Sequence, residues 1–151
     1  MQIHLKDIDN DNWIECIFLT TNKEGQHFIN EEFVASNAVS IAQSKIENGW
    51  ITKAIYDEDQ MIGFTMYGFS YEDHCYDICR MMIDHKFQGQ GYGKAALGKV
   101  IEEMKKIEDC TEIFLSFEPE NQIGKRLYES FNFQDTGKIV DGELLYSLKL
   151  K

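Results

Sequence analysis

The sequence predicts an α/β (α+β) fold, in which a mixed, mostly antiparallel central sheet of about six to seven strands is flanked by about four helices. Three patterns predict it. Strand-like runs follow one another across short turns between residues 51 and 83, as in an antiparallel meander. A glycine-rich loop at residues 88–93 separates the last of these runs from a helical pattern, and the chain ends in two more strand-like runs that turn at Asp141-Gly142.

The N-terminal third is expected to form one strand and two helices. Apolar residues alternate over residues 3–8 as in a strand, and Trp13 to Leu19 has helical periodicity. A second helix is expected from Asn30 to Asn48, because Asn30 and the acids after it suit a helix start and Asn48-Gly49 suits a stop. Its apolar stripe would consist of Phe33, Val34, Ala38, Ile41, Ala42 and Ile46.

The middle of the chain predicts three strands, a helix and a fourth strand. The meander strands are expected at Ile51 to Asp57, Met61 to Phe69 and Tyr76 to Ile83. A helix of about five turns opens near Lys94, and the strand Ile113 to Phe117 should lie beside residues 76–83. The stripe that packs this helix on the sheet consists of Ala96, Leu97, Val100, Ile101, Met104 and Ile107.

The C-terminal part predicts a helix and a hairpin. Pro119 ends the preceding strand and Asn121 is a candidate N-cap. The hairpin would pair Phe133 to Val140 with Glu143 to Leu150. The apolar stripe of the helix would be Ile123, Leu127 and Phe131.

Length and composition favour a single domain over residues 1–151. A chain of 151 residues that is 43% hydrophobic can bury one sizeable core. No apolar stretch is long enough to span a bilayer, and the first residues alternate like a strand, which differs from a signal peptide. We therefore expect a cytoplasmic protein without a membrane partner.

The net charge of −11 is unevenly distributed. Residues 1–85 contain 15 acids and 5 bases, whereas residues 86–151 contain 11 acids and 10 bases. Nucleic acid is an unsuitable partner, because binding it requires clustered Lys and Arg. A cationic ligand is favoured, and the alternative is that the acids serve only solubility.

The four cysteines lack the paired spacing of zinc or redox sites. Cys75 and Cys79 would lie roughly 13 Å apart along one strand, too far to form a disulfide. A metal site built from His74, Cys75, Cys79 and His85 is the alternative to buried, reduced cysteines. We predict no bound metal.

The loop Gln88-Gly89-Gln90-Gly91-Tyr92-Gly93 carries the strongest functional signal. Alternate glycines let backbone amides approach an anion, and the positive end of the following helix is aimed at the same point. A nucleotide-binding P-loop would need Ser or Thr after Lys94, where this chain has Ala95. A dinucleotide fingerprint is a further alternative, but the next strand lacks an acid at the usual offset.

At these residues the chain resembles the GNAT superfamily of acetyl-CoA-dependent N-acetyltransferases. Gln88, Gly91 and Gly93 match the family's loop motif, which is Gln or Arg, two residues, Gly, one residue, and Gly or Ala. Residues 121–133 are similar to its second motif, with Gly124 in place of Ala and Asn132 in place of Gly.

The resemblance implies the GNAT fold and acetyl-CoA as co-substrate. The pyrophosphate would bind the main-chain amides from Gln88 to Lys94, namely those of Gln88, Gly89, Gln90, Gly91, Tyr92, Gly93 and Lys94. In the family, the strands that match residues 76–83 and 113–117 splay apart around the pantetheine arm. Backbone groups near Met82 and Ile83 would then pair with the arm, and Asn121 would hold it from the other side.

Tyr128 matches the tyrosine with which many members protonate the leaving thiolate, and its alternative role is that of a core aromatic. An aliphatic ammonium with a pKa of about 10.4 must lose a proton before it attacks, yet no residue in the sequence identifies itself as the base. A nearby carboxylate favours the protonated amine, so acids that anchor the substrate should contact distal ammonium groups.

The chain also resembles bacterial polyamine (spermine and spermidine) acetyltransferases in Gln26, Phe28 and Ile29 before the second helix, in Gly63-Phe64 with Met66-Tyr67-Gly68, and in Arg80 ahead of the loop. Some members of that group carry an acid just before Arg80, where this chain has Cys79, and Asp77 is a candidate substitute on the same strand face. The expected function is acetyl transfer to a primary amine of spermine or spermidine by direct attack in a ternary complex. The substrate-binding candidates are Glu31, Glu32, Tyr67, Glu72, Asp73 and Asp77.

Two alternatives stay open. One is the same chemistry on another amine, such as an aminoglycoside, an amino acid or a peptide N-terminus. The other is a non-catalytic acyl-CoA-binding sensor that keeps the anion loop. A homodimer is also implied by the resemblance.

Overall fold

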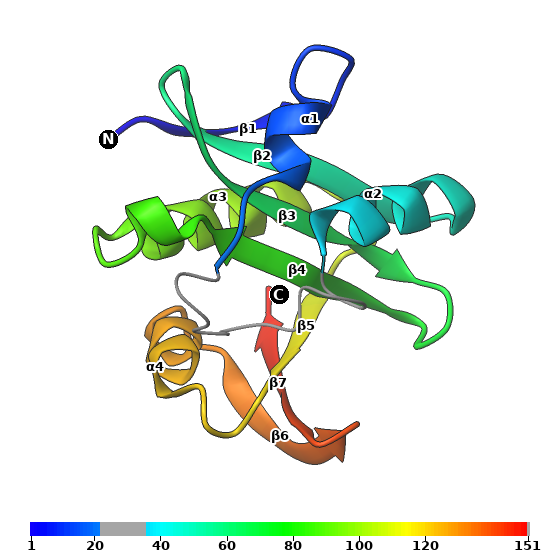
Figure 1. Cartoon of the computed structure of the whole chain (residues 1–151). Helices are drawn as coiled ribbons and strands as arrows, with labels where there is room; N and C mark the ends of the chain where they lie inside the picture. The colour runs from blue at the N-terminus through cyan, green and yellow to red at the C-terminus, as the bar shows by residue number, and fades with distance from the viewer. Residues whose placement is uncertain (22–35, 151) are drawn as a thin grey trace.

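The computed structural model describes residues 1–21 and 36–150, and within them seven strands form one sheet with the order β1-β2-β3-β4-β5-β7-β6 (Figure 1). The predicted fold class, a mostly antiparallel sheet with flanking helices, is confirmed. The elements are β1 Ile3–Asp7, α1 Trp13–Ile17, α2 Asn37–Ile46, β2 Trp50–Asp57, β3 Gln60–Ser70, β4 Cys75–Ile83, the 3-10 turn η1 His85–Phe87, α3 Tyr92–Lys105, β5 Glu112–Phe117, α4 Gln122–Ser130, β6 Gln134–Val140 and β7 Glu143–Lys149.

Helices cover both faces of the sheet (Figure 1). The predicted stripe of α3 is confirmed, since Leu97, Val100 and Met104 are fully buried against residues of β4, β5 and β7. On the other face, Cys16 of α1 and the partly buried Ile41 of α2 pack on a second cluster of residues from β2, β3 and β4. Across the described residues, no helix combines the length and the apolarity needed to cross a membrane.

The sheet is antiparallel from β1 to β4, and β4 and β5 form a short parallel pair. Among the described residues this pairing is confined to Tyr76 with Ile113 and Asp77 with Phe114. Figure 1 shows that β5 follows β4 only near their starts and then runs away toward α4. Because Asp77 belongs to the last pair, it marks the vertex at which the two strands diverge.

A β-bulge interrupts β4 two residues beyond this vertex. Met66 of β3 pairs with Arg80 and the next residue of β3 pairs with Ile78, so Cys79 is the extra residue. The Arg80 guanidinium donates to the Cys79 carbonyl at 2.8 Å and to its Sγ at 2.9 Å. The hydroxyl of the fully buried Thr65 donates to the Arg80 carbonyl at 2.8 Å. The bulge is therefore braced from both strands.

The stripe predicted for the second helix is confirmed at Ile41 and wrong at its other described positions. The buried residues of α2 are Asn37 and Ser40, whereas Ala38, Ala42 and Ile46 are exposed. The cause is polar: Ser36 caps the helix by accepting from the Val39 amide, and the Asn37 amide donates to the Cys16 carbonyl at 2.9 Å. The expected start at Asn30, with Phe33 and Val34, lies outside the described residues.

The stripe predicted for the last helix is wrong at Ile123, which is 74% exposed. Asn121 does cap α4 as predicted, with its Oδ1 accepting from the Gly124 amide at 2.9 Å. This cap fixes the rotation of the helix so that Gly124 is buried and the partly buried Leu127, Tyr128 and Phe131 pack on the core. The predicted hairpin and its turn at Asp141-Gly142 are confirmed by β6 and β7.

Candidate active site

The glycine loop adopts a backbone that requires glycine at two positions. Gly89 and Gly91 have φ of 77° and 83°, a region that other residues rarely adopt. A methyl group added at either residue would meet nothing within 4 Å, so the space above the loop is open. Gly91 is the N-cap residue of α3. The loop therefore offers a bare backbone at a helix N-terminus.

Backbone N–H groups of the loop are available to a ligand. The Ala95 amide makes the bond that opens α3, to the Gly91 carbonyl at 3.3 Å. Within the described residues, the amides of Tyr92, Gly93 and Lys94 donate to no protein group, as is normal for the first turn of a helix. Lys94 and Lys86 are exposed beside them. This arrangement can bind an anion such as a phosphate.

Side chains of the loop point away from the open backbone. The Gln88 amide donates to the Ile83 carbonyl at 3.0 Å. The Tyr92 hydroxyl donates to the Asp57 carboxylate at 2.6 Å, a bond that is the main cause of the lowered pKa of Asp57. Gln90 is exposed. These contacts hold the loop against the ends of β2 and β4 and leave its amides uncovered.

A buried carboxylate supports the loop from below. Asp84 is 1% exposed and accepts from the Lys86 amide at 3.2 Å and from the Thr20 amide at 2.9 Å. It therefore ties the end of β4 to the segment after α1. This role could not be predicted from the sequence, because an acid after a strand is usually solvated.

Helix α4 lies against the start of α3. A methyl group at Gly93 would contact the Leu127 side chain at 3.9 Å, and one at Gly98 would contact the Phe131 ring at 3.7 Å. Asn121 is fixed at the same end of α4 by its cap bond. A methyl group at Gly124 would lie 2.6 Å from the Asn121 Nδ2, so the glycine at this position lets the asparagine fold back over the helix.

Tyr128 lies on the face of α4 that meets the core. Its ring packs against those of Phe117 at 5.2 Å and Phe133 at 6.1 Å. Burial raises the pKa of its hydroxyl, and the charge of Glu143 on β7 raises it further. Within the part of the chain that the structure describes, the hydroxyl makes no hydrogen bond. A phenol in this state stays protonated at neutral pH and can donate a proton.

At the end of β4, Met82 and Ile83 are already engaged in contacts within the protein. Met82 is 5% exposed and packs in the cluster between the sheet and α1. The Ile83 carbonyl accepts from Gln88, so it is engaged before any ligand arrives. The bulge at Cys79 lies nearer the vertex of β4 and β5, and bulges re-aim backbone groups.

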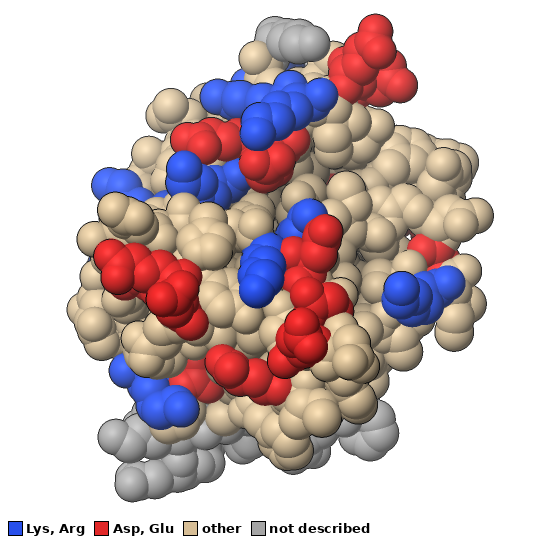
Figure 2. Space-filling view, turned by 90° about the horizontal axis from the view of Figure 1, so that it is seen from above, with Lys and Arg blue, Asp and Glu red and all other residues tan. Residues whose placement is uncertain are grey.

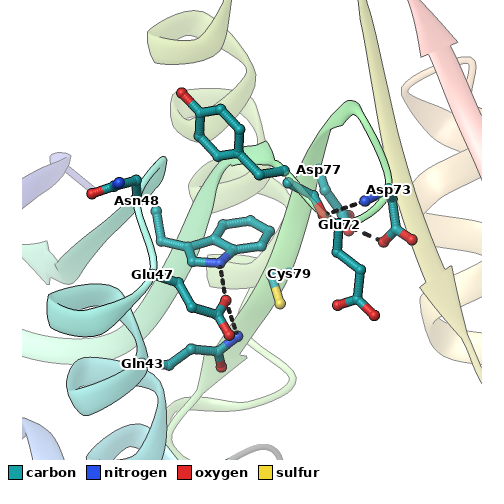
Figure 3. A pocket seen from close by; sticks show the side chains of 10 residues that line it. Gln43, Glu47, Asn48, Glu72, Asp73, Asp77 and Cys79 are labelled. Atoms are coloured by element: carbon teal, nitrogen blue, oxygen red, sulfur yellow. Dashed lines mark hydrogen bonds between the residues drawn. The ribbon is translucent and has the colours of Figure 1, made fainter.

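An acidic pocket of about 410 Å³ opens on the α2 side of the sheet. Figure 3 shows Glu47 on one side, Glu72 and Asp73 on the other, and Asp77 and Cys79 on the strand between them. Its other described lining residues are Gln43, Asn48, Trp50, Ser70 and Tyr71, so four acids and no base line it among the residues that the structure describes. The predicted residues Glu72, Asp73 and Asp77 are therefore brought together.

The acids of this pocket differ in their surroundings. Glu72 and Asp73 are exposed, and Asp73 accepts a bond from Ser70 at 3.4 Å. Glu47 accepts from Gln43 at 3.0 Å and from the Trp50 indole at 2.9 Å, and these bonds lower its pKa. Burial, followed by the charge of Asp73, raises the pKa of Asp77 to about 7.

The remaining predicted substrate residues lie elsewhere. Tyr67 is 3% exposed and packs in the cluster that faces α3, together with Leu97 and Val100, and burial raises its pKa to about 12. It supports the core and does not line the acidic pocket. Tyr67 was named as a substrate residue from the resemblance alone, whereas ordinary alternation along β3 turns Met66 toward α1 and Tyr67 toward α3. Glu31 and Glu32 lie outside the described residues.

Two groups near the site were missed from the sequence. Glu47 fell at the end of the second predicted helix and its partner Trp50 in no predicted element, and only the pairing of β2 with β3 brings the indole to the pocket. Glu143 was assigned to the final hairpin, yet its charge raises the pKa of both Asp77 and Tyr128. One carboxylate on β7 thus lies within electrostatic reach of both β4 and α4.

The alternative metal site finds no geometric support in the described residues, where no three His, Cys, Asp or Glu side chains are placed to hold an ion. Acidic residues are also not confined to the pocket. Figure 2 shows several groups of Asp and Glu side chains on another face, with Lys and Arg among them. Charge alone therefore does not identify a site on this molecule. The pocket differs from the other acidic groups in its position at Asp77, where β4 and β5 diverge.

Comparisons with known proteins agree with this geometry. The model of the acetyltransferase (GNAT) family matches residues 9–133. The spermine/spermidine N(1)-acetyltransferase of Bacillus subtilis (strain 168) is 28% identical over 148 residues, which cover 92% of each chain.

Two solved structures share the fold. A chimera of the spermidine N-acetyltransferase SpeG from Vibrio cholerae and hSSAT has a TM-score of 0.77 at 15% identity, with 99% of this chain and 96% of that chain covered. The PaiA N-acetyltransferase from Thermoplasma acidophilum in complex with coenzyme A has a TM-score of 0.71 at 14% identity, with 99% of both chains covered.

Proposed function

Because this chain belongs to the acetyltransferase (GNAT) family, we propose that it transfers the acetyl group of acetyl-CoA to a primary amine of a polyamine, such as spermine or spermidine. One observation carries the proposal. The strands β4 and β5 diverge after Asp77 and Phe114, with the bare glycine loop beyond the end of β4 and an acidic pocket at the vertex.

The residues present fit acetyl-CoA. Amides of the loop, from Gln88 to Lys94, would bind the pyrophosphate, because two of its glycines have positive φ and open space above them. The edge of β4 left by β5 would pair with the pantetheine amides as a strand does. Asn121 would contact the arm from α4. Met82 and Ile83 contribute backbone at this edge, although the Ile83 carbonyl is already engaged.

The bulge at Cys79 is proposed to supply the amide that contacts the thioester carbonyl, because it lies nearer the vertex than Met82 and Ile83, which the resemblance assigns to the arm. Its extra residue has no partner on β3, and Arg80 holds its carbonyl. An N–H group near this point would polarise the carbonyl of a bound thioester. Tyr128 would donate its proton to the departing thiolate, for which its raised pKa keeps it in the acidic form.

The acceptor is proposed to be a polyamine because, in the described part of the chain, the residues that line the pocket at the vertex include acids and no base. Glu72 and Asp73 would hold a distal ammonium, and Glu31 and Glu32 are proposed to contribute as well. The 28% identity to a spermine/spermidine acetyltransferase supports this choice. We further propose that the chain acts as one domain in the cytoplasm and associates as a homodimer.

The test is acetyl-CoA consumption with a panel of amines. Free thiol would be measured with spermine, spermidine, a diamine, an aminoglycoside and a peptide, and acetyl-CoA binding would be followed by calorimetry in the same preparations. Thiol release with the polyamines and little with the other amines is the expected result.

Equal rates with the aminoglycoside or the peptide would refute the polyamine assignment and leave acetyl transfer standing. Binding of acetyl-CoA without turnover on any amine would favour the sensor alternative. Absence of acetyl-CoA binding would refute the whole proposal.

A further inference from the structure

Asp77 is a half-buried carboxyl group at the vertex of β4 and β5. The proposed acetyl transfer assigns it no chemical role of its own. It belongs to the last residue pair before the strands diverge, and its side chain lines the acidic pocket beside Cys79. Within residues 1–21 and 36–150 its carboxylate accepts no hydrogen bond. A group in this place faces both the end of the strand gap and the pocket through which an amine would arrive (Figure 3).

We propose that Asp77 is the group that accepts the proton from the substrate ammonium, a role that rests on the proposed acetyl transfer. The position is the first reason, because the vertex is where a thioester lying between β4 and β5 would meet an amine from the pocket. Asp77 also lies on the same side of β4 as the bulge residue, because Cys79 lines the same pocket. Arg80 contacts the Cys79 Sγ.

The other acceptors in the pocket are less suitable. Glu47 is engaged by two donors, Gln43 and Trp50. Glu72 and Asp73 are exposed at the rim, where their attraction for a cation suits a distal ammonium. Burial raises the pKa of the Cys79 thiol to about 11, so this group is already protonated at neutral pH.

The charges around Asp77 come from several elements. Asp73 on the turn before β4 and Glu143 on β7 raise its pKa, Arg80 on β4 lowers it, and burial is the largest cause of the net value of about 7. Glu47 and Glu72 face the same pocket from α2 and the turn. A carboxylate with this pKa is a far better proton acceptor for an ammonium than an ordinary aspartate, and it is still ionised in a useful fraction at neutral pH.

The protons of the proposed reaction balance between the substrate, Asp77 and Tyr128. Asp77 takes one proton from the ammonium, and the neutral amine nitrogen attacks the thioester carbon to form the N–C bond. The C–S bond breaks and Tyr128 protonates the thiolate. The acylated nitrogen then gives one of its two protons to the Tyr128 phenolate and keeps the other in the amide. Asp77 releases its proton to solvent. The products are the acetylated amine, the free thiol and one proton.

The test is the pH dependence of kcat and kcat/KM for spermidine between about pH 6 and pH 10 in the wild type and three variants. Asp77→Asn should lower kcat by about 10²-fold near pH 7.5, and the defect should shrink toward pH 10, where free amine is abundant. Acetyl-CoA affinity should stay within about twofold, which shows that the fold is intact. Asp77→Glu should recover part of the rate and keep a titration limb.

Asp73→Asn is the matched control, because it makes the same carboxyl-to-amide change in the same pocket. It should raise KM for spermidine, because Asp73 is proposed to hold the distal ammonium, and it should lower kcat far less than Asp77→Asn does. It should also move the rising limb to lower pH, since the charge of Asp73 raises the pKa of Asp77.

An active wild type with an Asp77→Asn variant of unchanged kcat and unchanged pH limb would overturn the role of Asp77 and leave acetyl transfer intact. A wild type that acetylates no amine would overturn both. If Asp77→Asn loses acetyl-CoA binding, Asp77→Glu decides: a shifted limb supports the role, and a limb identical to that of the wild type refutes it.

Discussion

Tyr128 is positioned by rings, and this makes its proposed role testable with a small change. Phe117 and Phe133 contact its ring, and no described group bonds its hydroxyl. Tyr128→Phe should therefore keep the packing and lower kcat by about 10²-fold, because general acid catalysis typically contributes that much. Steady-state kinetics and calorimetry measure it. Tyr146→Phe, which removes a phenol from the same cluster, is the control and should change kcat less than about threefold; equal losses in turnover and acetyl-CoA affinity at Tyr128 would contradict an acid role.

Asp77 should also make the stability of the protein depend on pH. Its folded pKa of about 7 lies above the ordinary value of 3.8, so the fold disfavours its charged form. The stability that the protonated group contributes is complete below about pH 4 and is lost as the pH rises toward 7. Asp77→Asn should therefore gain stability over the wild type, by about 1–3 kcal/mol near pH 8 after allowance for solvent screening.

Urea unfolding near pH 5 and pH 8 measures this gain, which should be larger at the higher pH. Asp59→Asn, on an exposed turn, is the control and should change stability by less than about 0.5 kcal/mol at both values. A destabilised Asp77→Asn at pH 8 would show that the carboxylate is paired in solution.

The sequence predicted some residues of the candidate site correctly and missed others. Asn121 was expected to cap a helix and does so, and three of the acids expected to bind substrate share one pocket. The sequence could not show that Asp77 is half-buried or that Glu47 is held by Trp50, because both facts depend on strands and helices that are distant in the chain. Tyr67 was named from a family resemblance, and its burial depends on packing against Leu97 and Val100 of α3, which are distant in the chain.

At the scale of elements, a control glycine can distinguish the loss of anion binding from the backbone strain that any substitution at a left-handed glycine causes. Gly91→Glu places a carboxylate where the proposal puts a pyrophosphate and should abolish acetyl-CoA binding. Gly137→Glu is a matched control, since Gly137 also has φ of 83° and open space around it but lies on the edge strand β6. Both variants pay a left-handed strain of about 1–2 kcal/mol, so only the loop variant should lose binding in calorimetry; undiminished binding in Gly91→Glu would refute the anion cradle.

The bulge of β4 is stabilised by a hydrogen bond from Thr65 on β3. The hydroxyl of Thr65 is fully buried and donates to the Arg80 carbonyl, so Thr65→Val leaves that carbonyl without this donor. The variant should lose about 1–2 kcal/mol of unfolding free energy. Thr52→Val, on the neighbouring strand β2 and without a hydroxyl bond to described residues, should lose less than about 0.5 kcal/mol. Chemical denaturation measures both, and equal losses would show that the Thr65 bond does not stabilise the bulge.

Elements with one apolar face were predictable, and elements fixed by polar contacts were not. The stripe of α3 follows the sequence because the helix buries a continuous apolar face, including Leu97, Val100 and Met104, against the sheet. Helix α2 buries Asn37 and Ser40 because a bond from Asn37 to the α1 carbonyl sets its rotation. In α4 the Asn121 cap turns Ile123 outward. Hydrophobic periodicity contains no information on such bonds.

At the scale of the whole molecule, the net charge of −11 acts in opposite directions on the two proposed substrates. A polycation is attracted by the whole surface and by the pocket, so added salt should screen that attraction. Between about 20 and 300 mM salt, kcat/KM for spermidine should fall by about threefold or more. Acetyl-CoA is an anion that meets local amides and the nearby Lys86 and Lys94 against a repulsive overall charge, so its KM should change by less than about twofold. Initial rates across a salt series test the pair, and a parallel loss for both substrates would show that the acidic surface does not guide the amine.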